Sequence, residues 1–228
     1  MHKDEWESFN LDVVSKFENL RIKILYDSPY ALRSLLFYHI IPQFSPKNIF
    51  IAVYSDTMQR RLEKTYESMA RISPEIAEII GKAKIIKIGT NASTSFGKLQ
   101  HSIPMDSEWL KTFMKILEEL SDRDLMLFHG FSLLPRIYGE SSLKYVLDLF
   151  EAIPDGPTII SKSHRSIYDE RTNMFINMLY DTILRIEKIE DVGLEEFYKI
   201  GVSQSIVMDV RPGFSRFKID RSGRLIEV

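Results

Sequence analysis

The chain of 228 residues is 44% hydrophobic and 27% charged, a composition typical of a globular protein and not of a disordered one. Its 30 Lys and Arg residues nearly balance its 32 Asp and Glu residues, so no overall field draws it to nucleic acid or to an anionic membrane. The absence of cysteine excludes disulfides, thiol nucleophiles and Cys-ligated metal sites.

The N-terminal stretch MHKDEWESFN is charged and lacks the apolar run of a signal peptide. No later stretch approaches the roughly 18 apolar residues that a membrane-spanning helix needs. We therefore expect a cytoplasmic protein.

Strand and helix patterns alternate along the first part of the chain. Apolar periodicity predicts helices over 5–19, 32–41 (stopped by Pro42), 57–70 and 74–80. Apolar runs predict strands over 21–26, 48–55 and 83–89.

The same alternation continues after a polar stretch, 90–104, that we expect to be an irregular loop. Helices are predicted over 107–120, 141–152 and 169–180, the first two capped by Ser107 and Ser141. Strands are predicted over 124–129, 157–163, 182–189 and 205–211, and over 214–228 with a turn at Ser222 and Gly223.

Five successive strand-then-helix units predict an α/β protein with a mostly parallel central sheet between helices. The closing strands, joined by short turns, predict an antiparallel C-terminal extension. With no linker-like segment in the sequence, we expect a single domain over 1–228, made of an N-terminal helix (1–20), a parallel core (21–188) and the antiparallel extension (189–228).

The turn after the first strand lies where a phosphate loop, G-x-x-x-x-G-K-[ST], would lie. On that template Asp27 and Leu32 replace the two glycines, Arg33 replaces the lysine, and only Ser34 fits. The order of elements nevertheless resembles the RecA/KaiC-like ATPase core, a P-loop NTPase fold with three layers. The stretches YDSPYA, VYSDT and IIKIGT are similar to those of an archaeal family of RecA-like proteins with no assigned activity.

Each substitution in this degenerate Walker A motif opposes triphosphate binding. The Asp27 carboxylate would repel a phosphate charge by about 4 kcal/mol at about 4 Å and an effective dielectric of about 20. Leu32 disfavours the backbone that glycine adopts, and Pro29 removes a loop amide. The planar guanidinium of Arg33 does not substitute for the point charge of lysine.

The magnesium side of the implied site is also altered. The resemblance implies an aspartate at the end of strand 124–129, where this chain has His129, a poor magnesium ligand. Asp56 retains one acid at the implied catalytic position, and Thr57 follows it. We therefore predict a pseudoenzyme that uses neither ATP nor magnesium.

Four metal-ligating residues fall at predicted strand ends: Asp27, Asp56, His129 and His164. Ligands gather at such ends in parallel sheets, and two histidines with two carboxylates could bind zinc. Because the four come from separate elements without a spacing motif, we favour ordinary polar or capping roles and predict no metal.

Two loops follow the fourth and fifth strands, and the resemblance to recombinases makes both candidates for DNA contact. The stretch 161–171 offers Lys162, Arg165 and Arg171 but also two acids. A basic C-terminal run, Arg211, Arg216, Lys218, Arg221 and Arg224, is another candidate or else the charged face of an edge hairpin.

The loop over 130–140 is apolar, with Phe131, Leu133, Leu134, Ile137 and Tyr138 around a proline. It either folds back over the sheet end or forms a docking surface. Our leading hypothesis is a non-catalytic RecA-like module that binds a protein or peptide, self-association included. The alternatives are an atypical ATP-binding protein or ATPase that uses Arg33 and Ser34, and a DNA-associated accessory protein.

Overall fold

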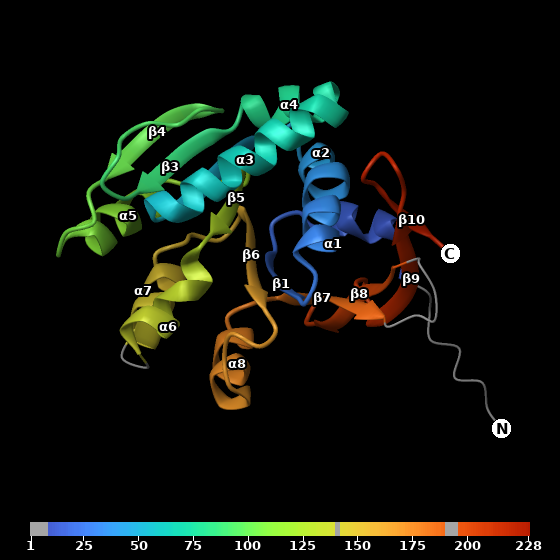
Figure 1. Cartoon of the computed structure of the whole chain (residues 1–228). Helices are drawn as coiled ribbons and strands as arrows, with labels where there is room; N and C mark the ends of the chain where they lie inside the picture. The colour runs from blue at the N-terminus through green and yellow to red at the C-terminus, as the bar shows by residue number, and fades with distance from the viewer. Residues whose placement is uncertain (1–8, 140–141, 190–195) are drawn as a thin grey trace. The chain divides into compact units, whose positions relative to one another are not determined.

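The computed structural model describes residues 9–139, 142–189 and 196–228 (Figure 1). The chain divides into two compact units, one formed by the residues up to Gln43 together with Ser163–Val228, the other by Phe44–Lys162. Each unit is described by itself.

The first unit contains one parallel strand pair continued by antiparallel strands. Its strand order is β10-β9-β8-β7-β1, with β1 (Arg21–Tyr26), β7 (Thr182–Ile189), β8 (Phe197–Ser205), β9 (Gly213–Ile219) and β10 (Leu225–Glu227). β1 and β7 are parallel, and the other neighbours are antiparallel. Its helices are η1 (Leu11–Phe17), α1 (Pro29–Ser34), η2 (Leu35–Ile40), α2 (Ile41–Gln43) and α8 (Glu170–Asn177).

The second unit contains a parallel sheet in the order β6-β5-β2-β3-β4. Its strands are β2 (Asn48–Tyr54), β3 (Lys84–Ile88), β4 (Lys98–Ile103), β5 (Asp124–His129) and β6 (Thr158–His164), the last of which ends beyond the unit boundary. Its helices are α3 (Asp56–Ile72), α4 (Pro74–Gly81), α5 (Trp109–Leu117), η3 (Phe131–Leu133), α6 (Leu134–Tyr138) and α7 (Leu143–Glu151). In Figure 1 the long helix α3 runs along the sheet, and it packs on β2.

The predicted fold class is confirmed: a mostly parallel α/β sheet with antiparallel C-terminal strands. The apolar runs in β2 and β5 are almost entirely buried, as expected when helices cover both faces of a parallel sheet. Aromatic rings fill the core of the second unit, where Phe131 lies between Phe113 and Phe128 at centroid distances of 5.2 and 5.0 Å.

Two predictions of strand positions were wrong. The predicted loop 90–104 contains β4, whose alternate side chains Lys98, Gln100 and Ser102 are exposed, so the apolar signal of a strand is weak there. The predicted strand 205–211 is instead a turn in which the Val207 amide bonds Ser205 Oγ and Met208 is 95% exposed. The strand lies earlier, at β8.

Several helix boundaries also differ from the prediction. The helix predicted at 32–41 begins at Pro29, because Ser28 caps it and proline suits its first turn, and helical structure with a π-helical segment continues past Pro42 to Gln43. Of the helix predicted at 5–19, residues 5–8 lie outside the described part and Leu11–Phe17 is a 3-10 helix. The predicted cap Ser141 also lies outside it, and α5 begins at Trp109, after Glu108 and not Ser107.

Within the described residues, none of the helices combines the length and apolar character required to cross a membrane. The expectation of a single domain stays a prediction.

Candidate functional site

The turn between β1 and α1 is short, because only Asp27 and Ser28 separate the strand from the helix. The Asp27 amide donates to the carbonyl of Ile186 at 3.2 Å, and its carboxylate accepts the Lys188 amide at 2.8 Å. Both polar groups of Asp27 therefore fasten β1 to β7.

The amides at the N-terminus of α1 are hydrogen-bonded by Ser28, the residue that caps the helix. Ser28 Oγ accepts the Ala31 amide at 3.3 Å, and the Ser28 carbonyl accepts the Leu32 amide at 3.0 Å. The Leu32 side chain is buried, whereas the exposed Arg33 guanidinium lies 5.7 Å from the ring of Tyr30.

Ser34, the one residue that fits the phosphate-loop pattern, is buried at 2% exposure. Its Oγ donates to the carbonyl of Gly223, 2.6 Å away, in the turn between β9 and β10. This bond ties the first helix to the C-terminal hairpin.

In the second unit, Asp56 forms a dense polar cluster where β2 and β3 end. One carboxylate oxygen accepts from Lys87 Nζ at 2.9 Å and from the Asn91 amide at 3.2 Å. The other accepts from the Thr90 amide at 3.0 Å and the Thr90 hydroxyl at 2.5 Å. Gly89 allows this close approach, since a Cβ there would lie 2.7 Å from the Asp56 carboxylate.

These donors lower the pKa of Asp56 well below its usual range, the Thr90 hydroxyl bond being the largest cause and Lys87 the next. Four donors saturate most of the carboxylate's lone pairs. Asp56 is therefore a fixed anion and a weak base. Ser55 before it adopts φ 83° and ψ 151°, a backbone region nearly confined to glycine, and its amide is bonded to the Ile88 carbonyl at 2.8 Å.

His129 ends β5 opposite Val53 of β2. Burial lowers the pKa of His129 well below its usual value, and the charges of Lys162 and Arg61 act in the same direction, against the main chain of Met58. Within the described part of the chain, neither ring nitrogen has a hydrogen-bond partner of normal geometry. The imidazole is therefore neutral.

His164, in the first unit, has its ring edge-on to Tyr26 at 5.6 Å and its Nδ1 2.8 Å from Ser166 Oγ. Asp27, Leu32, Arg33 and Ser34 belong to the same unit, whereas Asp56 and His129 belong to the other. Across residues 9–139, 142–189 and 196–228, no group of three or more histidines or carboxylates could hold a metal ion.

The candidate partner-binding residues divide by burial. The segment predicted as a loop is helical, with Phe131 and Leu134 buried and Leu133 half-buried. Ile137 and Tyr138 are 57% and 44% exposed, and the Tyr138 hydroxyl lies 2.9 Å from that of Tyr54. One side of this stretch thus fills the core and the other faces solvent, and the docking surface stays a prediction.

The nucleic-acid candidates are less available than the sequence suggests. Lys162 is half-buried, and burial lowers its pKa to about 8. Arg165 forms an ion pair with Glu187 at 2.8 Å, while Arg171 is exposed. In the C-terminal run, the Arg216 guanidinium lies 3.8 Å from the ring centroid of Phe197.

Sequence reasoning missed the partners of Asp56 and the pocket beside them. A cavity of about 350 Å³ in the second unit is lined by eight polar or charged residues: Asp56, Gln59, Arg60, Glu63, Lys87, Thr90, Asn91 and Ser93. The sequence contained one sign of this cluster: Lys87 lies inside the apolar run IIKI, and a lysine in a buried strand needs a charged or polar partner.

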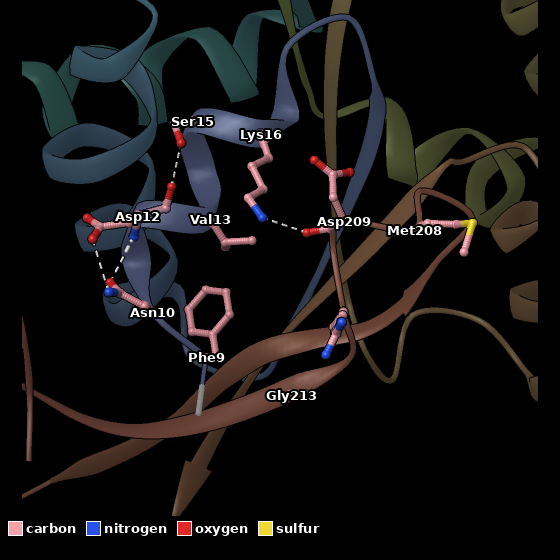
Figure 2. A pocket seen from close by; sticks show the side chains of 10 residues that line it. Phe9, Asn10, Asp12, Val13, Ser15, Lys16, Met208, Asp209 and Gly213 are labelled. Atoms are coloured by element: carbon pink, nitrogen blue, oxygen red, sulfur yellow. Dashed lines mark hydrogen bonds between the residues drawn. The ribbon is translucent and has the colours of Figure 1, made fainter. Parts of the chain in front are cut away.

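A larger cavity, of about 760 Å³, lies in the first unit between η1 and the segment 208–213 (Figure 2). Figure 2 shows Lys16 reaching the main chain of Asp209, whose carbonyl accepts its ammonium at 2.7 Å. Asn10 bonds Asp12 across the same wall. The Lys16 ammonium and the polar groups of Asn10 and Asp12 are thus bonded within the lining itself.

No protein-family model and no curated protein matches the sequence. Among solved structures, the fold is similar to protein PH0250 of Pyrococcus horikoshii OT3, with a TM-score of 0.63, 16% identity and coverage of 95% of this chain and 97% of that one. It is also similar to the KaiC-like protein PH0186 of the same organism, with a TM-score of 0.60, 11% identity and coverage of 92% and 90%.

The chain has a RecA/KaiC-like fold. The resemblance drawn from the order of its elements is thereby confirmed, and both of these neighbours come from an archaeon. At these identities the likeness shows the fold alone.

Asp56→Asn should lower the free energy of unfolding by about 3 kcal/mol at pH 7, because the Lys87 ammonium would stay buried without a counter-charge. The depressed pKa of Asp56 stabilises the fold fully above the pKa of the unfolded chain, about 3.9, and this stabilisation declines as the pH falls toward the folded-state value. The difference between wild type and variant should therefore shrink at low pH.

Urea unfolding at pH 7 and pH 3 measures both effects. Glu78→Gln is the matched control, because the Glu78–Lys82 pair is exposed and its loss should leave the unfolding midpoint unchanged. An Asp56→Asn protein as stable as wild type at pH 7 would contradict the structural role of this carboxylate.

Proposed function

We propose that this chain is a non-catalytic RecA-like module that acts by binding a protein or peptide. The observation that carries the proposal is the turn between β1 and α1, where the helix begins only two residues after the strand. A phosphate loop needs several successive amides that point into an open turn at a helix N-terminus. Here the Asp27 and Leu32 amides are bonded within the fold, and Pro29 has none.

The residues present do not fit Mg-ATP. Ser34 would have to offer its hydroxyl oxygen to the cation, but this oxygen is buried against the Gly223 carbonyl. In the other unit, the neutral His129 lacks the hard oxygen that magnesium prefers. The Asp56 carboxylate already accepts from four donors, which lower its pKa and make it too weak a base to take a proton from water.

The proposed docking face consists of Ile137, Tyr138 and Tyr145 on α6 and α7, two helices that contact each other. These side chains are 57%, 44% and 41% exposed. Beneath them the buried Phe131 and Leu134 anchor the segment, and the bond to Tyr54 orients Tyr138. Aromatic residues held rigid in this way favour protein contact, because little side-chain entropy is lost on binding. A second copy of the chain is the first partner to test.

Mg-ATP should leave the melting temperature of the protein unchanged at about 5 mM. A ligand at 1,000 times its dissociation constant adds about 4 kcal/mol, which for a chain of this size raises the melting temperature by about 8 °C or more. Differential scanning fluorimetry with and without magnesium measures this. A magnesium-dependent rise that Ser34→Ala abolishes would instead support the ATP-binding alternative.

Ile137→Asp should convert a self-associated protein into a monomer in sedimentation velocity, since a carboxylate would be buried in the interface. Ile72→Asp is the matched control, because Ile72 is 56% exposed and lies at the end of α3, outside the docking face. A wild-type protein that stays monomeric at high concentration, or equal effects of the two substitutions, would contradict self-association through this face.

A further inference from the structure

The antiparallel sheet of the first unit has one face turned to the core. Strands β7, β8 and β9 lie side by side (Figure 1), and residues paired across them point to the same face. On one face Tyr198, Ile200 and Phe217 are buried, and Phe9 packs on the Phe217 ring at a centroid distance of 6.1 Å. The core of the unit therefore lies on that side.

The opposite face carries cationic and aromatic side chains. The pairing register places on it charged and aromatic residues from all three strands: Arg185 and Glu187 of β7, Phe197 and Lys199 of β8, and Phe214, Arg216 and Lys218 of β9. Lys199 and Arg216 are exposed, whereas the two phenylalanines are half-buried. This face thus reaches solvent and offers ring surface as well as charge.

The rings and cations of this face contact each other between β8 and β9. The Arg216 guanidinium carbon lies 3.8 Å from the Phe197 ring centroid, and Lys199 Nζ lies 4.5 Å from that of Phe214. Gly201, which is paired with Phe214, leaves room for the ring, because a Cβ there would lie 2.8 Å from it. Cross-strand contacts therefore hold both rings beside a positive charge.

Positive charge exceeds negative charge on this face. Among the described residues that the three strands place there, Glu187 is the one acid, and Arg165 neutralises it at 2.8 Å. The other charged residues of the face are all cationic: Arg185, Lys199, Arg216 and Lys218. The whole chain has 32 acidic and 30 basic residues, so this excess of cations is local.

Edge protection does not account for these cations. Charged side chains commonly keep the edge strand of a sheet from pairing with another chain. Here β8 lies between β7 and β9, and β9 lies between β8 and β10, so neither strand is an edge. The alternative of a charged edge hairpin thus loses its basis for Lys199, Arg216 and Lys218.

A single-stranded nucleic acid matches the combination of cations and rings. Its phosphates attract lysine and arginine, and its unpaired bases stack on aromatic rings and on guanidinium planes. An acidic protein segment would match the charge, but its carboxylates have no flat faces to stack on the rings. A duplex keeps its base faces stacked on one another and so offers the phosphates alone.

We propose that the solvent face of β7, β8 and β9 binds a single-stranded nucleic acid. Bases stack along Phe214, Phe197 and the guanidinium of Arg216, and phosphates accept from Lys199 and Arg185. RNA and DNA bind alike, because both have the phosphates and base planes that these contacts use. This site lies within the first unit and does not depend on the proposed docking face.

The acids near this face restrict where the phosphates lie. Glu190, Asp191 and Glu195 follow β7 in the sequence, outside the described residues, and would repel a phosphate. Arg185 is paired with Gly201, four residues along β8 from Phe197, where that connection ends. We therefore place the phosphates toward the Arg185 end of the face.

Fluorescence anisotropy of the full chain with labelled oligonucleotides of about 12 nucleotides tests the proposal. Oligo(dT) and oligo(rU) should bind with similar dissociation constants, and a duplex of the same length should bind about tenfold more weakly. Raising the salt from about 50 to about 200 mM should weaken single-strand binding about 20-fold, because about three phosphate contacts give a slope of about −2 for log affinity against log salt.

Two variants separate the charge from the stacking. Lys199→Ala should weaken binding and reduce the steepness of the salt dependence by about 0.7, whereas Lys98→Ala, which removes an exposed lysine from β4 in the second unit, should change neither. Phe214→Leu retains an apolar side chain without the ring, so it should weaken binding about tenfold and leave the salt dependence unchanged. Thermal melting checks the fold of each variant.

Three kinds of result would overturn the inference. The first is no change in anisotropy with either single strand at about 50 μM protein in low salt. The second is equal affinity for single strand and duplex, or equal losses in Lys199→Ala and Lys98→Ala, which would indicate attraction by charge alone. The third is displacement of oligo(dT) by polyglutamate as effectively as by unlabelled oligo(dT), which would assign the face to an acidic protein. Lys199→Ala tests the site even where Phe214→Leu fails to fold.

Discussion

A lysine ammonium buried in a parallel strand needs a fixed anion, and Asp56 supplies that anion to Lys87 at the carboxyl ends of β2 and β3 in the second unit. Lys87 is 2% exposed, and the carboxylate that neutralises it also binds the amides of Thr90 and Asn91. One side chain thus compensates a buried charge and shapes the turn after β3. Removing Asp56 would leave the Lys87 ammonium buried without a counter-charge.

In the first unit, the polar groups after β1 and in α1 also form hydrogen bonds that hold the fold together. Asp27 fastens β1 to β7, Ser28 caps α1, and Ser34 holds the turn of the C-terminal hairpin at Gly223. In a parallel sheet these strand ends are the usual place for ligands. Here the polar groups bond the fold itself, which is the physical basis for proposing a module that retained the architecture without the nucleotide chemistry.

The sequence predicted the parts of the fold that depend on local patterns. β2 and β5 were predictable because helices cover both faces of their sheet and their apolar runs are nearly unbroken. β4 was missed because every second residue of this strand is exposed and polar. The strand after β7 was predicted too far along the chain, because the apolar residues Ile206 and Met208 resemble part of a strand in the sequence but lie exposed in a turn. The sequence predicted Asp56 as a retained acid at the implied catalytic position. It could not predict that the carboxylate is occupied by hydrogen-bond donors, because Lys87 and Asn91 reach Asp56 only through the parallel pairing of β2 with β3.

The central claim, that the strand-end carboxylate belongs to the fold and not to a reaction, rests on the ionisation of Asp56. A pH titration followed by carbon NMR of its carboxyl group tests this directly. The account predicts that Asp56 stays ionised to well below the usual aspartate pKa of about 3.9, as long as the protein remains folded. A titration midpoint at or above that value would contradict the account and make Asp56 available as a base.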